Sequence, residues 1–167
     1  MDEKEMKRKE RLAEKEFKEW LDKHNIPYWY IQQDIDTFSR ALKKYMTKRP
    51  DFMILVPHVG FILTDVEFKK PAEKYKVFQI DENEAKQYCN LQNYFNLQVW
   101  YVFSSEEYHF NTWFWIPVSK VLEVGKSYKN KKTGEVYRSV SLEKFITVSA
   151  TDNLGRLFSQ TAKFFNE

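Results

Sequence analysis

The sequence predicts an α/β protein with a mixed sheet. Three observations indicate this class: a helical pattern near the start of the chain, two consecutive strand patterns joined by a turn, and a second helical pattern followed by a strongly apolar strand. With 167 residues, of which 43% are hydrophobic and 17% aromatic, the chain can bury a core of ordinary size. We therefore expect one domain over residues 1–167.

The first expected element is an amphipathic helix over residues 3–24. Glu, Lys and Ala dominate this stretch, and Phe17, Trp20 and Leu21 recur at helical spacing without an intervening Gly or Pro. Pro27 follows closely after the pattern stops, and proline does not continue a helix. The helix should therefore present one apolar face to the core.

The next segments predict a strand, a short element and a hairpin. Residues 27–33 are rich in Tyr, Trp and Ile, which suits a strand, and residues 36–45 suit a short helix or an ordered loop. Residues 51–56 and 61–68 are strand patterns separated by a break at residues 57–60 that contains Pro and Gly. A break of this length favours an antiparallel hairpin.

A helix and a buried strand follow the hairpin. Asp81 and the acidic residues after it are typical of a helix N-terminus, and the apolar spacing continues to about Phe95. Residues 98–103 are apolar or aromatic at successive positions, as in a central strand covered on both faces. The order strand, strand, helix, strand implies a mixed sheet.

The last third of the chain is predicted to be a β-rich decoration on that sheet. Residues 110–118 and 145–148 favour strands, residues 127–137 favour a turn, and a short helix is expected from about Asn153. The expected core is therefore residues 10–103, with an extension over residues 104–167.

Composition excludes several functional classes. No apolar run approaches the roughly 18 residues that span a bilayer, and the charged start does not resemble a secretory signal, so we expect no membrane partner and a cytoplasmic location. The single Cys89 cannot form an intramolecular disulfide, and the three histidines lack zinc-ligand spacing. Net charge is only +3, so bulk charge does not predict nucleic-acid binding.

Charged side chains gather on one face of the second hairpin strand. Side chains alternate along a strand, so Asp65, Glu67 and Lys69 share a face, while Val66 and Phe68 point to the other. If the apolar pair faces the core, two carboxylates and an amine form one column. A hard divalent cation would compensate the carboxylates, which predicts a Mg²⁺ or Mn²⁺ site with Asp65 and Glu67 as ligands.

Asp51 is predicted to complete this site. It begins the first hairpin strand, and a residue early in one strand of a short hairpin lies opposite a residue late in the other. Pro50 suits a strand start, where its missing N–H is tolerated. Lys69 would then position an attacking water or a phosphate, and hydrolysis of a phosphodiester is the chemistry that such a site favours.

These residues resemble the signature of a known family. Pro50-Asp51 followed by Glu67-Phe68-Lys69 is similar to the active-site motif of the PD-(D/E)xK nuclease superfamily, closest to its resolvase-like and repair branches. The resemblance extends over about residues 10–103. It implies a restriction-endonuclease-like α/β/α core, and a metal-dependent endonuclease, a hydrolase of nucleic acid that cuts DNA more often than RNA.

The resemblance also implies two helical site residues. Members of the family often add an acid from the opening helix, for which Glu14 fits best and Glu10 and Glu16 are rivals. A polar residue on the helix after the lysine often contributes, and Gln87 is the candidate, with Gln92 behind it. The alternative for Glu14 is a surface carboxylate, and the alternative for Gln87 is an ordinary helix residue.

Two groups of basic residues are candidates for contacts with nucleic-acid phosphates. The group leading into Asp51 is preferred because it would lie near the metal site, and it comprises Lys43, Lys44, Lys48 and Arg49. The basic turn within residues 126–138 could form a wing that touches phosphates, or it could be a solvated hairpin.

Two alternatives to this interpretation, and one expectation about assembly, follow from the same residues. The charged column over residues 65–69 would also suit a solvated edge strand, where charges discourage pairing with other chains. The domain could instead be a non-catalytic module that binds nucleic acid or protein. A homodimer is expected if the protein cuts both strands of a duplex, since two cuts usually need two active sites.

Overall fold

The computed structural model describes residues 3–31 and 38–158. Its helices and strands follow one another along the chain as α1 (Glu3–Lys23), β1 (Tyr28–Tyr30), α2 (Arg40–Lys44), β2 (Phe52–Val56), β3 (Gly60–Phe68), β4 (Val77–Asp81), α3 (Glu82–Phe95), β5 (Val99–Ser104), β6 (Thr112–Pro117), α4 (Val118–Val124), β7 (Lys126–Lys129), β8 (Val136–Ser141) and β9 (Ile146–Ser149). Short 3₁₀ helices lie at Glu106–Tyr108, Leu142–Lys144 and Leu154–Phe158.

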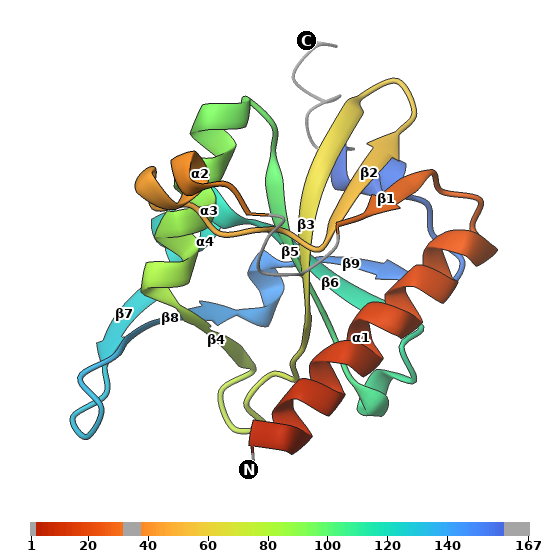
Figure 1. Cartoon of the computed structure of the whole chain (residues 1–167). Coiled ribbons are helices and arrows are strands. Elements are labelled where there is room, and N and C mark those ends of the chain that lie inside the picture. Colours follow the sequence, from red (N-terminus) through yellow and green to blue (C-terminus); the bar gives the residue numbers. More distant parts are fainter. Residues whose placement is uncertain (1–2, 32–37, 159–167) are drawn as a thin grey trace, which may run out of the picture.

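A mixed sheet of six strands forms the centre of the protein (Figure 1). Its order is β1-β2-β3-β5-β6-β9, and β3 and β5 form its parallel pair, while the other neighbours are antiparallel. A separate antiparallel sheet has the order β4-β8-β7. The predicted α/β class with a mixed sheet is confirmed.

Helix α1 packs across one face of the six-stranded sheet (Figure 1). Phe17 is its central anchor, with ring centroids 5.3 Å from Phe52, 4.9 Å from Trp113 and 5.6 Å from Trp115. Aromatic pairs at such spacings add attraction to the burial of apolar area. The expected amphipathic helix is therefore confirmed, and its apolar face is the one that Phe17 and Leu21 define.

Helices α3 and α4 cover the opposite face of the sheet, where a second hydrophobic cluster lies (Figure 1). Tyr88 of α3 meets Tyr101 of β5 edge to face at 5.6 Å, and Phe78 of β4 packs against Phe103 at 5.1 Å. Every residue of β5 is buried, as the sequence predicts for a strand covered on both sides.

The structure corrects the interpretation of residues 104–167 as a decoration. Strands β6 and β9 belong to the main sheet, and Trp113 and Trp115 of β6 are fully buried in the cluster beneath α1. Leu154 and Leu157 pack into the same cluster. The apolar core beneath α1 therefore includes residues after position 103, which were predicted to lie outside the core.

The structure tests the predicted hairpin and several predicted element boundaries. The hairpin of β2 and β3 forms as predicted, with Phe52 opposite Thr64. Strand β4 and helix α4 were not predicted, since each is short and lacks a distinctive pattern. Residues 32–33 of the first predicted element and 36–37 of the second lie outside the described residues. Within the described ranges, no helix combines the length and apolar character needed to cross a membrane.

Candidate metal centre

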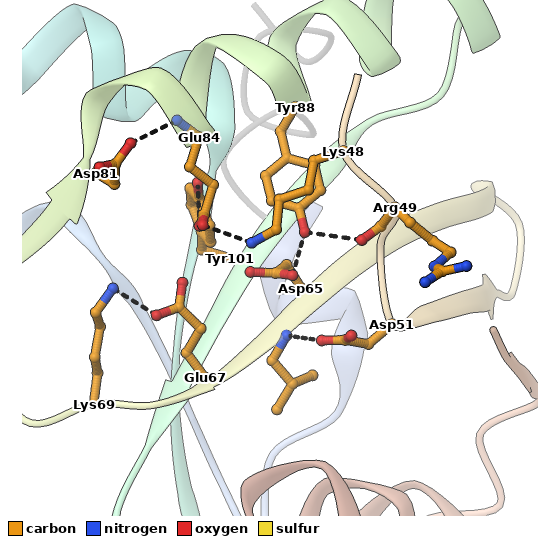
Figure 2. Close-up of polar contacts among 11 residues, drawn as sticks. Lys48, Arg49, Asp51, Asp65, Glu67, Lys69, Asp81, Glu84, Tyr88 and Tyr101 are labelled. Atoms are coloured by element: carbon orange, nitrogen blue, oxygen red, sulfur yellow. Dashed lines mark hydrogen bonds and ion pairs between the residues drawn. The ribbon is translucent and has the colours of Figure 1, made fainter. Parts of the chain in front are cut away.

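The pairing between β2 and β3 ends at Thr64, and the candidate site begins there. Strand β2 starts at Phe52 opposite Thr64, so the rest of β3 pairs only with β5. The carboxylate of Asp51 then replaces a backbone partner, because its Oδ2 accepts a hydrogen bond of 2.7 Å from the N–H of Val66 (Figure 2). Asp51 thus satisfies a backbone donor that the end of β2 would leave unpaired.

The predicted alternation along the end of β3 is confirmed. Val66 and Phe68 pack into the cluster beneath α1, whereas Asp65 and Glu67 lie on the side of α3 (Figure 2). Asp65 is only 5% exposed, and β3 is an interior strand between β2 and β5. The alternative of a solvated edge strand is therefore wrong.

Three carboxylates meet at this position. One oxygen from each of Asp65, Glu67 and Glu84 lies within 4.8 Å of the other two, and we call this set the acidic triad. Glu84 reaches it from the first turn of α3, where Asp81 caps the helix by accepting a hydrogen bond of 2.8 Å from the N–H of Glu84. Helix α3 therefore adds a third candidate ligand to the two on β3.

Two oxygens of the triad are buried without a hydrogen-bond donor among the described residues. They are Oδ2 of Asp65 and Oε1 of Glu67. A buried acceptor without a partner costs free energy, and the cost is greater when the acceptor carries charge. The set of hard oxygen ligands, together with these two unpartnered atoms, fits a divalent cation such as Mg²⁺ or Mn²⁺.

The pKa values of the two strand carboxylates are driven apart. Burial raises the pKa of Asp65 to about 7, and the charges of Glu67 and Glu84 also raise it, while Lys48 and Tyr88 oppose the shift. Burial acts on Glu67 in the same direction, but its pKa is lowered overall because Lys69 lies 2.6 Å from Glu67 Oε2. Asp65 is therefore the carboxylate that takes up a proton near neutral pH.

The hydroxyl of Tyr88 contacts two acceptors. It hydrogen-bonds Oδ1 of Asp65, and it lies 3.1 Å from the backbone oxygen of Arg49 (Figure 2). A hydroxyl has one proton, so Tyr88 donates to only one of them at a time. Donation from Tyr88 favours the ionised form of Asp65, so it lowers the pKa of Asp65, while burial raises that pKa and is the larger effect.

Lys48, a predicted phosphate contact, lies against the acidic triad, and its side chain is 38% exposed. Its Nζ lies 2.5 Å from Oε2 of Glu84 and 5.2 Å from the centre of the Tyr88 ring. Burial alone would lower the pKa of Lys48, but the carboxylates of Asp65 and Glu84 raise it overall. Its ammonium group is therefore a positive charge held against the acidic triad (Figure 2).

The other basic candidates occupy different positions. Lys43 and Lys44 are exposed at the end of α2, so they remain available for the predicted phosphate contacts. The guanidinium of Arg49 lies 5.8 Å from the centre of the Phe38 ring, beside the chain that leads into Asp51. The structure thus separates the predicted basic group into an exposed pair and an inward-facing Lys48.

Helix α1 contributes two acids at the border of the site. Glu14 accepts a hydrogen bond of 2.6 Å from the hydroxyl of Tyr30, and its charge is one of the causes, after burial and Asp65, that raise the pKa of Asp51. Burial and then the charge of Glu67 raise the pKa of Glu10. Among the rival helix acids, Glu10 and Glu14 are thus the ones electrostatically linked to the site.

The acidic triad differs in membership from the predicted site. Asp65 and Glu67 are in it, while Asp51 lies beside it and is held by its hydrogen bond to Val66. The helix residue in the triad is Glu84, and no hydrogen bond joins Gln87 to these carboxylates among the described residues. The sequence shows Glu84 only as part of an acidic helix start, a pattern with an ordinary capping explanation.

The arrangement can hold one hard cation between two secondary-structure elements and keep positive side chains next to it. Such a centre suits reactions in which negative charge develops on a phosphate or a carbonyl oxygen. Comparison of the sequence with models of known protein families and with curated proteins gave no match. A functional assignment therefore depends on the residues of the site.

Proposed function

We propose that this protein is a metal-dependent endonuclease that hydrolyses phosphodiester bonds of nucleic acid, with DNA favoured over RNA. The observation that carries the proposal is the acidic triad, in which buried Asp65 Oδ2 and Glu67 Oε1 have no donor among the described residues. The resemblance of Pro50-Asp51 and Glu67-Phe68-Lys69 to the PD-(D/E)xK motif supports the reaction class, and the preference for DNA comes from that resemblance alone.

The order of elements supports a restriction-endonuclease-like three-layer α/β/α core. An opening helix, an antiparallel hairpin, a helix and a strand parallel to the second hairpin strand follow one another as α1, β2 with β3, α3 and β5. Helices cover both faces of the sheet. The candidate residues lie at the end of β3 and the start of α3, which this order brings together.

The side chains of the site divide into ligands and positive groups. Asp65, Glu67 and Glu84 would hold Mg²⁺ or Mn²⁺, which when bound would make a water more acidic and offset charge on the phosphate. Lys69, 2.6 Å from Glu67, would orient the attacking water or the scissile phosphate, as its place in the motif suggests.

Asp51 and the helix acids would act next to these ligands. Asp51 is buried beside Asp65, and burial followed by the charges of Asp65 and Glu14 raises its pKa. A carboxyl with a raised pKa holds its proton more tightly, and a nearby cation favours the ionised form, so Asp51 would release a proton as the cation binds. Glu14 would tune this behaviour through its charge.

Cleavage and metal-binding assays test the proposal directly. The purified protein is incubated with duplex, branched and single-stranded DNA and with RNA, in Mg²⁺, Mn²⁺ or chelator, and Mn²⁺ binding is measured by calorimetry. We expect metal-dependent cleavage that Asp65→Asn and Lys69→Met each reduce by about 100-fold or more. The matched control Glu123→Gln, an exposed acid of α4, should cleave normally.

Two results would contradict the proposal. Metal-dependent cleavage that survives both Asp65→Asn and Lys69→Met would show that the reaction occurs elsewhere. Binding of nucleic acid without cleavage on any substrate would support the non-catalytic module instead. The molar mass of the protein in solution, measured with and without duplex, also tests the expected homodimer.

A further inference from the structure

The small sheet carries a groove that the proposed function does not use. The groove has a volume of about 790 Å³, and its walls include Tyr75 from the loop after β3, Tyr128 and Tyr137 from β7 and β8, and Lys126, Lys129 and Lys144. We call it the tyrosine–lysine groove. Tyr75 is 68% exposed and Tyr128 is 62% exposed, so both rings are accessible to a ligand.

Alternation along the strands of the small sheet explains why Tyr128 and Tyr137 face outward. Phe78 of β4 lies opposite Val140 of β8, and both are buried against the main sheet. The intervening positions therefore point away from the core, where Tyr128 lies directly opposite Tyr137. The outer face of this sheet presents paired aromatic rings instead of an apolar core surface.

Positive charge is concentrated around the groove. Within residues 126–144, the walls of the groove carry three lysines, Lys126, Lys129 and Lys144, and one acid, Glu143, while the whole chain has a net charge of only +3. The rest of the chain is therefore close to neutral. Lys126, Lys129 and Lys144 are exposed in this segment, and no salt bridge is formed by Lys126 or Lys129 among the described residues. The groove is thus complementary to a polyanion.

We propose that the tyrosine–lysine groove binds single-stranded nucleic acid, with bases stacked on Tyr75 and Tyr128 and phosphates contacted by the lysines. Exposed aromatic rings combined with lysines match the chemistry of unpaired strands, whose bases are free to stack. A duplex keeps its bases stacked inside, so it would engage the lysines and leave the tyrosines unused. The exposed rings of Tyr75 and Tyr128 therefore favour the single strand.

The first turn of α3 joins the acidic triad to the small sheet, on the face of that sheet opposite the groove. Glu82 of α3 is hydrogen-bonded to the small sheet. Its Oε2 accepts a hydrogen bond of 2.7 Å from Nε of Arg138 and one of 3.2 Å from the hydroxyl of Ser127. Glu84, two residues later, belongs to the triad. The inference rests on the proposed function for its class of ligand, and it assigns the unpaired part of a substrate to the small sheet.

Fluorescence anisotropy tests the groove without any cleavage. The full chain is titrated against a labelled 20-nucleotide thymidine strand and a labelled 20-base-pair duplex, both in chelator and at several salt concentrations. We expect the single strand to bind more tightly than the duplex. Tyr75→Ala and Tyr128→Ala should each weaken its binding about fivefold or more, as expected when one base–aromatic stack is removed.

Charge variants and matched controls complete the test. Lys126→Gln combined with Lys129→Gln should reduce the salt dependence of single-strand binding, by a slope of about 0.7 for each phosphate that a lysine no longer neutralises. Tyr94→Ala, which removes a 57% exposed tyrosine at the end of α3, and Lys18→Gln on α1 should leave binding unchanged. Thermal melting confirms that each variant is folded.

Three results would overturn the groove assignment: no binding to either oligonucleotide, tighter binding to the duplex, or single-strand binding that the tyrosine variants do not change. The proposed nuclease fails separately. If single strands bind as expected but no substrate is cleaved in Mg²⁺ or Mn²⁺, the endonuclease proposal is lost and the binding groove remains.

Discussion

Replacing Asp65 with asparagine should stabilise the metal-free protein at pH 8. The carboxyl of Asp65 is buried, and one of its oxygens has no donor among the described residues. Burial and the charges of Glu67 and Glu84 raise its pKa from 3.8 to about 7. At pH 8 this side chain is therefore ionised in the folded state at a cost, and asparagine removes that cost while keeping the shape.

The size and sign of the effect follow from the difference between folded and unfolded pKa values. The folded state holds the Asp65 proton more tightly than the unfolded state, so stability falls as pH rises from 3.8 to about 7 and stays low above it. The full shift corresponds to about 4 kcal/mol. We expect Asp65→Asn to gain about 2 kcal/mol in the free energy of unfolding, which is less than the full shift because the new amide N–H groups need acceptors. A gain of this size raises Tm by about 4–8 °C.

Thermal unfolding of both proteins at pH 4 and pH 8, with and without Mn²⁺, provides the measurement. The advantage of Asp65→Asn should be present at pH 8 and nearly absent at pH 4. Mn²⁺ should stabilise the original protein, by about 2.7 kcal/mol at 100 times its Kd, and should stabilise the variant much less. The electrostatic account of Asp65 is refuted if the variant is less stable than the original protein at pH 8 without metal. It is also refuted if the difference in stability between the two proteins is the same at pH 4 and pH 8.

Three further predictions concern the same site and the core. Lys48→Met removes the ammonium 2.5 Å from Glu84 and should raise Mn²⁺ affinity at least tenfold in calorimetry; unchanged affinity would mean that Lys48 does not compete with the cation. Mn²⁺ affinity should fall by up to tenfold per pH unit below pH 7, because the cation displaces the proton on Asp65, and this dependence should be weaker in Asp65→Asn. Phe17→Ala should cost about 3–5 kcal/mol in urea unfolding, since its ring packs against Phe52, Trp113 and Trp115; a cost under 1 kcal/mol would contradict that packing.

Local patterns in the sequence were enough to predict most of the main elements. The helical spacing of Phe17 and Leu21, the hairpin around Gly60 and the cap at Asp81 depend on residues close together in the chain, and the structure has each of them. Strand β4 and helix α4 were missed because they are short and their patterns are weak.

The role of the last third of the chain was not predictable in the same way. A strand such as β6 carries no information about which sheet it joins, although the size and apolar character of Trp113 and Trp115 favour a core position for both. They are buried because β6 pairs with β5 and brings them beneath Phe17 of α1. That outcome depends on pairing between distant segments.

The charged column of Asp65, Glu67 and Lys69 was predictable from the residues alone, because alternation along a strand is a property of the backbone and needs no tertiary contact. The partners of that column depend on how distant elements pack. Glu84 joins it from α3, and Lys48, 36 residues before Glu84, neutralises part of its charge. These contacts form because α3 packs on the sheet, and the spacing of the residues along the chain does not predict them.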